Sequence, residues 1–211
     1  DELIEVIGRE PRVESHIHLP LQSGSDKILR KMNRRYDSAR YLELVRKLRS
    51  ARENISISTD LIVGFPGETE EDFEATLRVM EEVRFDAAFT FLYSPRVGTP
   101  AADWFDESQQ DIVRERFMRL VEYQNECSLA SNRALEDKVL DVLVDGRSRR
   151  DDTVLSGRTH DDRLVNFAGV LRENTSCLCN SFADVCRGDI VRVAIERANV
   201  NSLDGRLVKD D

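Results

Sequence analysis

Long hydrophobic runs are missing from this sequence of 211 residues. No stretch approaches the roughly 18 uninterrupted apolar residues that a transmembrane helix needs, so we expect no membrane span. The first residues, Asp1–Glu5, are acidic and lack the basic flank and apolar core of a secretion signal. We therefore expect a cytoplasmic protein with no membrane partner.

Basic residues are also fewer than acidic residues. The chain has 31 lysines and arginines against 40 aspartates and glutamates, which gives a net charge of −9. This balance argues against a protein that coats nucleic acid without specificity, but it leaves room for local RNA contacts. With 40% hydrophobic residues, the chain has the composition of a folded protein and not of a disordered one.

Cysteines are few, and their spacing fits no common metal site. The chain has four, Cys127, Cys177, Cys179 and Cys186. Without an export signal they indicate reduced thiols in a reducing compartment. The last three match neither a zinc ribbon nor a ferredoxin-type cluster motif, so we assign no metal to this chain and leave their role open.

The first two-thirds of the sequence alternates between strand and helix patterns. Strands are expected at 14–21, 55–63 and 86–93, and helices at 25–33, at 38–51 and after a cap at Thr69. Such units pair in parallel, but three strands cannot close a (β/α)₈ barrel of ~250 residues. We therefore predict that residues 1–106 form an incomplete, partial TIM-like parallel β/α barrel, the C-terminal part of a larger α/β protein.

A long connecting helix is predicted at 107–136, followed by a different, β-rich texture. Strands of a small antiparallel β-barrel are expected within 137–211, at 138–145, 153–159, 163–167, 189–196 and 200–208. The polar, cysteine-bearing segment 168–188 is expected to be a long loop.

Polar residues at strand ends are the candidate ligand contacts. Asp60 lies three residues before the end of a strand that is otherwise expected to be buried, and Gln22 ends the first strand in the same way. Gly64 begins a glycine-containing turn into a helix, where a ligand is able to lie against the backbone. The planar guanidinium group of Arg34 is suited to bind a carboxylate through two hydrogen bonds. Taken alone, the turn also fits a plain strand–helix connection, and Arg34 also fits a solvated helix end.

The family resemblance comes from long, ordered blocks. The sequence resembles the later half of radical S-adenosylmethionine (SAM) methylthiotransferases at 18–26 (HLPLQSGSD), 29–36 (LRKMNRRY), 58–69 (STDLIVGFPGET) and 89–101 (FTFLYSPRVGTPA). Residues 22–25 and 93–96 look like the tRNA-modifying branch. The tail resembles the RNA-binding, OB-like TRAM barrel that ends these enzymes, at 155–159 (LSGRT), 164–167 (LVNF) and 202–208 (SLDGRLV).

The resemblance implies radical chemistry on tRNA. A reduced [4Fe-4S] cluster would cleave SAM to a 5′-deoxyadenosyl radical, and a second [4Fe-4S] cluster would supply sulfur. A methylthio group would then be added to C2 of an N6-isopentenyl-type adenosine beside the anticodon. The implied partners are the tRNA anticodon stem-loop and an electron donor such as flavodoxin or ferredoxin. We expect a monomer.

By the same resemblance, Gln22 and Asp60 would hold the ribose hydroxyls of SAM, and Arg34 its carboxylate. The adenine would lie against the backbone of Ile62, Val63 and Gly64.

Three residues are implied to contact RNA. Arg96 would face the tRNA backbone or the modified base. Arg158 and Asn166 lie inside the TRAM-like blocks and are the first candidates there. The alternative for any single arginine of the tail is a solvated surface paired with the neighbouring aspartates.

One departure from the family is large, because the Cys-x₃-Cys-x₂-Cys motif of the radical-generating cluster is absent. We therefore expect both clusters to be bound by a missing N-terminal portion, no catalytic residue in this chain, and no activity of the chain alone. Three alternatives stay open: a methylthiotransferase for threonylcarbamoyl-adenosine, a cluster-less tRNA-binding remnant, and a metal-free phosphate-binding barrel enzyme.

Overall fold

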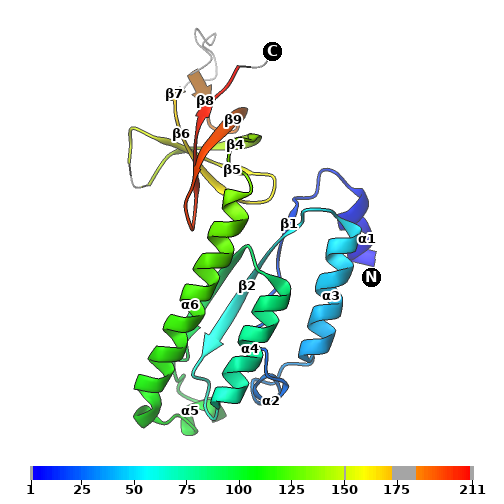
Figure 1. Ribbon diagram of the computed structural model, residues 1–211, viewed down its shortest axis with the longest axis vertical. Coiled ribbons are helices and arrows are strands. Elements are labelled where there is room, and N and C mark those ends of the chain that lie inside the picture. Colours follow the sequence, from blue (N-terminus) through cyan, green and yellow to red (C-terminus); the bar gives the residue numbers. More distant parts are fainter. Residues whose placement is uncertain (1, 150, 173–183, 210–211) are drawn as a thin grey trace. The chain divides into compact units, whose positions relative to one another are not determined.

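The computed structural model describes residues 2–149, 151–172 and 184–209, and two compact units make up this part of the chain (Figure 1). The first unit comprises the residues up to Val13 and Ile17–Cys127, and the second comprises Glu14–His16 and the residues from Ser128 onward. The expectations for Cys177 and Cys179 lie outside the described residues. None of the described helices is both long and apolar enough to cross a membrane.

The first unit is an α/β structure with a sheet of three strands in the order β1-β2-β3. Its elements are α1 (Glu2–Arg9), β1 (His16–His18), α2 (Asp26–Lys31), α3 (Ser38–Ala51), β2 (Ser56–Val63), α4 (Glu70–Val83), β3 (Ala87–Leu92), α5 (Pro100–Asp103), the 3₁₀ helix η1 (Glu107–Gln109) and α6 (Gln110–Arg133). Strands β2 and β3 pair in parallel from Ser58–Ala87 to Val63–Leu92. The expected strand–helix–strand unit is therefore present.

Local signals explain where the main helices begin. Thr69 caps α4 as expected, and its side chain and that of Asp72 form a reciprocal capping box. Asp37 caps α3 by accepting a hydrogen bond from the backbone N–H of Arg40.

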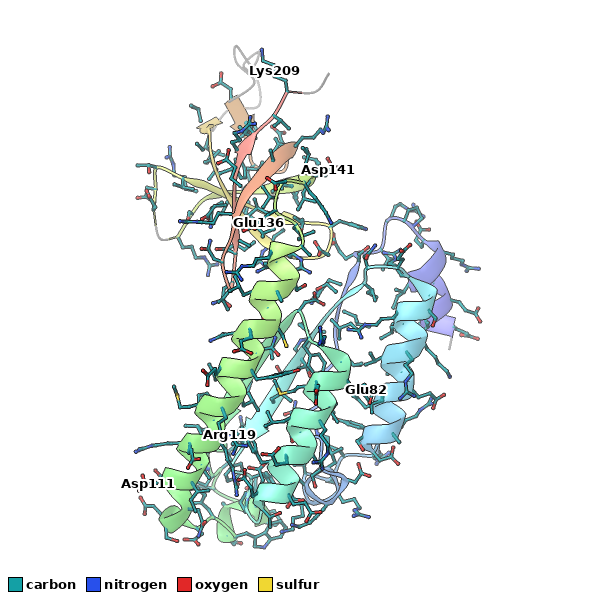
Figure 2. All side chains as sticks on the ribbon, viewed as in Figure 1. Glu82, Asp111, Arg119, Glu136, Asp141 and Lys209 are labelled. Atoms are coloured by element: carbon teal, nitrogen blue, oxygen red, sulfur yellow. The ribbon has the colours of Figure 1, made fainter. Side chains whose placement is uncertain are left out.

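An ion pair links two of the helices. Arg119 of α6 contacts the carboxylate of Glu70 on α4 at 2.6 Å (Figure 2).

One face of the sheet is covered, and it holds the core of the first unit. Ile57, Leu61 and Val63 of β2 pack against α3, α4 and α6. The alternate residues of β2 lie on the other face, where Asp60 and Ile62 are opposite Phe89 and Phe91 of β3. These two phenylalanines are 59% and 50% exposed. The helices of the described residues therefore cover one face and leave an open face.

The strand expected at 14–21 is shorter than predicted, because β1 has three residues. Pro20 has no N–H to donate to a ladder, and Gln22 takes a positive φ of 68°. Gln22 still forms an isolated parallel bridge with Leu61 of β2. Helices α1 and α5 were not expected. Helix α1 buries Ile7 in the core that also contains α3.

The second unit contains a closed five-stranded barrel in the order β10-β6-β5-β4-β9. The strands of this unit are β4 (Val139–Arg147), β5 (Leu155–Thr159), β6 (Leu164–Ala168), β7 (Val170–Arg172), β8 (Asp184–Cys186), β9 (Ile190–Ala198) and β10 (Leu203–Leu207). The barrel core is apolar and includes Val142, Phe167, Val193 and Leu203. The barrel expected from the strand spacing is therefore present.

The prediction of a purely antiparallel barrel is wrong in one pair, because β10 pairs with β6 in parallel. Strand directions cannot alternate all the way around a closed ring with an odd number of strands, so at least one pair must be parallel. The expected loop at 168–188 is also corrected at its flanks, where β7 and β8 pair in parallel. The predicted helix at 107–136 begins with the 3₁₀ turn η1, and α6 ends at Arg133.

Candidate functional site

A short string of polar side chains crosses the open face of the sheet. Gln22 Nε2 lies 3.5 Å from Asp60 Oδ2, and His18 Nε2 lies 3.4 Å from Asp60 Oδ1. The other ring nitrogen of His18 is 3.0 Å from the hydroxyl of Ser58. The structure therefore brings together Gln22 and Asp60, the two predicted ribose contacts. His18 joins them, and it was not among the predicted site residues.

The backbone fixes Gln22 against β2. The N–H of Gln22 donates to the carbonyl of Asp60 at 2.8 Å, and the carbonyl of Gln22 accepts from the N–H of Ile62 at 2.9 Å. Gln22 itself is buried. These two bonds continue the sheet past the end of β1, so the Gln22 side chain is held beside Asp60.

The segment after Gln22 is bound to the start of α4. Asp72 accepts hydrogen bonds from the hydroxyl of Ser25 at 2.7 Å and from the ammonium of Lys27 at 2.6 Å, in addition to those from Thr69. Burial alone raises the pKa of Asp72, but these hydrogen bonds outweigh it and hold the pKa well below its usual range. The charged carboxylate ties the beginning of α2 to α4.

Arg34 follows α2 and is exposed. Two residues further on, the hydroxyl of Tyr36 donates to the carbonyls of Pro20 and Leu21 at 3.1 Å each, directly before Gln22. This contact brings the chain around Arg34 to the end of the sheet that carries Gln22. No hydrogen bond or ion pair among the described residues joins the Arg34 guanidinium to Gln22 or Asp60. Its role as a carboxylate contact therefore stays a prediction.

The three predicted adenine contacts differ in which backbone or side-chain groups they leave available to a ligand. The N–H of Ile62 is used by Gln22, but its half-buried side chain lies on the open face. Val63 is buried in the helix-covered core, and its carbonyl accepts from the N–H of Tyr93 at 2.9 Å. Of the three, Ile62 offers apolar side-chain surface to a ligand on this face.

Gly64 is constrained by α6. It has a φ of 80°, and a Cβ at this position would lie 2.4 Å from Cγ1 of Val113. A side chain is therefore excluded by the close approach of a helix, whether or not a ligand binds. From the sequence, this glycine fitted either a bound ligand or a plain strand–helix connection, and no local pattern predicts its contact with α6.

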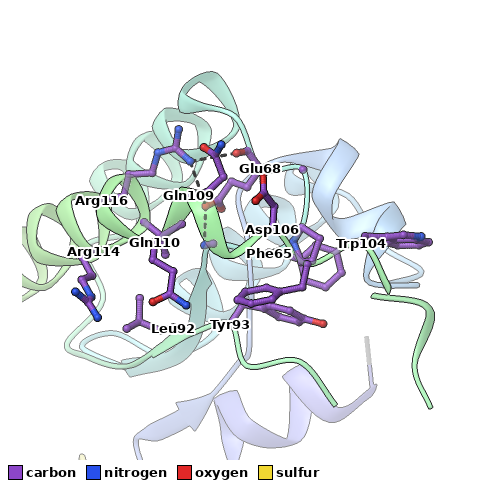
Figure 3. Close-up of a pocket in the computed structure, with 15 residues that line it drawn as sticks. Phe65, Glu68, Leu92, Tyr93, Trp104, Asp106, Gln109, Gln110, Arg114 and Arg116 are labelled. Atoms are coloured by element: carbon purple, nitrogen blue, oxygen red, sulfur yellow. Dashed lines mark hydrogen bonds and ion pairs between the residues drawn. The ribbon is translucent and has the colours of Figure 1, made fainter. Parts of the chain in front are cut away.

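A cavity of about 160 Å³ lies beyond the ends of β2 and β3, between the loop after Gly64 and the start of α6 (Figure 3). Aromatic rings form one wall. The ring of Phe65 meets that of Tyr93 edge to face with centroids 5.2 Å apart, and the Tyr93 and Phe105 centroids are 6.1 Å apart. This cavity was not predicted from the sequence.

Glu68 is a buried acidic residue among the polar residues that line this cavity (Figure 3). One of its carboxylate oxygens accepts from the N–H of Gly64 at 2.8 Å and lies 3.9 Å from the guanidinium of Arg116. Burial raises the pKa of the Glu68 carboxyl group to about 7, and the Gly64 bond and the Arg116 charge lower it only in part. Glu68 therefore fixes the turn after β2.

A groove of about 960 Å³ lies on the barrel of the second unit. Its lining is rich in charged residues, five arginines and three aspartates, for a net charge of +2 in a chain whose net charge is −9. These residues are Asp145, Arg147, Arg149, Asp151, Arg158, Arg187, Arg197 and Asp204. The groove is therefore a positive region on an acidic protein.

Both predicted RNA contacts of the second unit line this groove. Arg158 Nη1 donates to the carbonyl of Asp162 at 2.9 Å and lies 3.4 Å from its carboxylate, so Arg158 is partly paired as the alternative expected. Asn166 donates to Asp204 at 3.3 Å. Arg96 lies in the first unit, exposed, after β3. The other groove residues, Arg197 and Asp204 among them, were missed because cross-strand neighbours leave no local signal.

The described residues offer no fit to an iron–sulfur cluster. Among them, no group of three or more His, Cys, Asp or Glu side chains is placed to hold a metal ion. Cys127 is in the first unit and Cys186 in the second, and both are half-buried. The open face does fit a nucleoside ligand, because Asp60 is a partly exposed carboxylate acceptor beside the amide of Gln22.

Two family models match the chain. Residues 1–80 match the Radical SAM superfamily, and residues 133–208 match the TRAM domain. Coproporphyrinogen III oxidase (HemN) from Escherichia coli, described as a Radical SAM enzyme, aligns with a TM-score of 0.43 at 16% identity, covering 69% of this chain and 41% of that chain.

Curated relatives match almost the whole chain. The tRNA-2-methylthio-N(6)-dimethylallyladenosine synthase of Clostridium botulinum is 48% identical over 205 residues, 97% of this chain and 43% of that protein. The synthase of the same name from Bacillus subtilis is 46% identical over 99% of this chain and 38% of that protein. The chain thus spans about two-fifths of the length of these relatives. Residues 1–80 thus match the Radical SAM superfamily and residues 133–208 match the TRAM domain, and the chain aligns with the C-terminal part of these tRNA synthases.

Proposed function

We propose that the complete protein adds a methylthio group to C2 of N6-isopentenyl-type (dimethylallyl) adenosine beside the tRNA anticodon. The observation that supports this most directly is the 48% identity to a synthase of that name along 97% of the chain. The sequence blocks around Gln22 and Asp60 have a physical counterpart, because these two side chains meet on the open face of the sheet.

In this proposal SAM binds on the open face. The sheet would be part of an incomplete, TIM-like barrel whose other strands lie outside this chain, so the open face would line the interior. The carboxylate of Asp60 would accept hydrogen bonds from the ribose hydroxyls, and the amide of Gln22 would donate to one of them. Ile62 would pack against the adenine, and Arg34 would reach the carboxylate of the amino acid.

The chemistry itself belongs to the cofactors. With SAM at a reduced [4Fe-4S] cluster, they supply a radical able to take hydrogen from an unactivated aromatic carbon, which no side chain of this chain can do. The two clusters would be bound by residues outside this chain. Exposed Phe89 and Phe91 would keep water away from the reacting groups.

The barrel groove would hold the tRNA. Its net charge of +2 suits a phosphate backbone, and Arg158 and Asn166 lie within it. Arg96 would contact the RNA from the first unit. An electron donor such as flavodoxin or ferredoxin, a monomeric state and a cytoplasmic location complete the proposal.

The groove also supports a second candidate function, a tRNA-binding remnant without catalysis, because RNA binding in this groove requires no iron–sulfur cluster.

A third candidate is a methylthiotransferase that acts on threonylcarbamoyl-adenosine. This enzyme would use the same site residues.

Liquid chromatography with mass spectrometry of tRNA nucleosides tests these readings. A strain that lacks the gene should accumulate N6-isopentenyl-type adenosine without the methylthio group, and the complete gene should restore the methylthio form. Loss of methylthio-threonylcarbamoyl-adenosine would favour the changed substrate. Unchanged nucleosides in the deletion strain would favour the remnant.

A further inference from the structure

The structure assigns Asp204 as a positioning residue for RNA binding, at the centre of a row of four polar side chains across the barrel groove. The row consists of Ser156, Asn166, Asp204 and Arg197, and we call it the Asp204 row. This inference rests on the proposed tRNA binding and adds Ser156, Asp204 and Arg197 to Asn166, which the family resemblance already implies as an RNA contact.

The strand register builds the row. Asp204 of β10 is directly opposite Asn166 of β6 on one side and Arg197 of β9 on the other. Asn166 is in turn opposite Ser156 of β5. Directly opposed residues share one face of a sheet, so the four positions follow one line across four strands. All four line the groove.

A bulge in β9 lies beside the Asp204 row. Asp204 pairs with Arg197 and Gly205 pairs with Ile195, so Glu196 of β9 is the extra residue at this register shift. A Cβ at Gly205 would lie 2.4 Å from the carbonyl oxygen of Ala194, so the two strands approach closely there. Such bulges re-aim a neighbouring side chain. Here Asp204 lies in the groove between its two cross-strand partners.

Asp204 holds its neighbours with both oxygens. Oδ1 accepts from Asn166 at 3.3 Å, and Oδ2 accepts from Asn199 at 3.0 Å and from Nε and Nη2 of Arg197 at 3.0 and 2.6 Å. Burial works to raise the pKa of Asp204, but these bonds hold it below its usual value. The carboxylate is therefore charged at neutral pH and fixes the orientation of both partners.

The partners keep donors for RNA. Arg197 is 72% exposed, and its Nη1 group has no partner among the described residues. Asn166 gives one of its two amide hydrogens to Asp204 and keeps its carbonyl oxygen. The row thus offers a charged donor and an amide, side by side, in a positive groove. This combination suits a single-stranded RNA segment, with its phosphate on Arg197 and a base edge or 2′-hydroxyl on Asn166.

A positioning role and a plain charge effect predict opposite signs for D204N. Removing a negative charge from an RNA groove by itself strengthens binding, because the groove becomes more positive. If Asp204 orients Arg197 and Asn166, the replacement of one of its two carboxylate oxygens by an amide NH₂ group leaves at least one partner without its acceptor and weakens binding in spite of that gain. A matched control is D145N, which removes the same charge from the same groove at a residue 4.0 Å from Arg158.

The experiment is fluorescence anisotropy with the full 211-residue chain and a labelled anticodon stem-loop RNA, over a series of salt concentrations. We expect D204N to raise the Kd about fivefold. Its log Kd should also depend less steeply on log salt, by about 0.7–0.9, as for one lost phosphate contact. D145N should bind as tightly as the unmodified chain or up to about twofold more tightly.

Tighter binding by D204N, with a steeper salt dependence, would show that Asp204 only neutralises Arg197 and would overturn the inference. If D204N does not melt cooperatively, N166A and R197Q decide, because unmodified affinity in both would remove the row from the RNA contact. Absence of binding by the unmodified chain would instead refute the proposed tRNA binding itself.

Discussion

At the scale of single residues, Glu68 shows how burial sets the charge state of a site. Its side chain is 2% exposed, and its carboxylate faces one backbone N–H and one guanidinium at 3.9 Å. Desolvation is the largest contribution and raises the pKa of Glu68 to about 7. The folded protein therefore holds this proton at pH values where the unfolded chain has lost it.

This difference predicts a pH dependence of stability. Between the ordinary pKa near 4.5 and the folded value near 7, the native state binds more protons, so the free energy of unfolding falls as pH rises. We expect a loss on the order of 2 kcal/mol from pH 5 to pH 8. E68Q keeps an acceptor for Gly64 and should remove most of this slope. Urea unfolding followed by fluorescence of Trp104, the single tryptophan, measures it in the first unit.

An E68Q variant whose stability falls with pH as steeply as that of the unmodified chain would show that another group carries the dependence.

At the scale of elements, the turn after β2 is fixed from both sides. Glu68 binds the Gly64 amide from the loop, and Val113 of α6 lies against the Gly64 Cα. The sequence identified this turn and the Thr69 cap, since both are local patterns. The contact between Gly64 and α6 was not predicted, because this helix begins more than forty residues later in the chain.

This contact predicts a coupled pair of substitutions. G64A should cost about 2–4 kcal/mol, from the positive φ and from a Cβ 2.4 Å from Val113. V113A should cost about 1–3 kcal/mol by loss of packing. The double variant should be less destabilised than the sum by at least about 0.5 kcal/mol, because V113A makes room for the new methyl group. Strict additivity in urea unfolding would mean that the strain at Gly64 is conformational alone.

At the scale of the whole molecule, success and failure of prediction follow the range of the interactions. Helices α3 and α4 and strands β2 and β3 were predicted, because periodicity and caps encode them locally. The three-residue β1, the pairing of β7 with β8 and the parallel closure of the barrel were not, because each depends on partners distant in the sequence.

The same distinction between local and distant interactions applies to the candidate site. Gln22 and Asp60 came from family-like sequence blocks, and the structure brings their side chains together. His18, Asp204 and Arg197 were not predicted as site residues, because only the register of neighbouring strands places them beside their partners. The contact of Arg34 with the carboxylate of SAM stays a prediction.

The account depends on SAM binding beside Asp60, and the SAM dissociation constant of the complete, cluster-reconstituted protein tests it most directly. Equilibrium dialysis should compare D60A with E53Q, which changes an exposed carboxylate near the opposite end of β2. Loss of a charged acceptor for the ribose predicts about tenfold or weaker SAM binding for D60A and no change for E53Q. SAM binding by D60A as tight as that of the unmodified protein, with the clusters intact, would contradict the account.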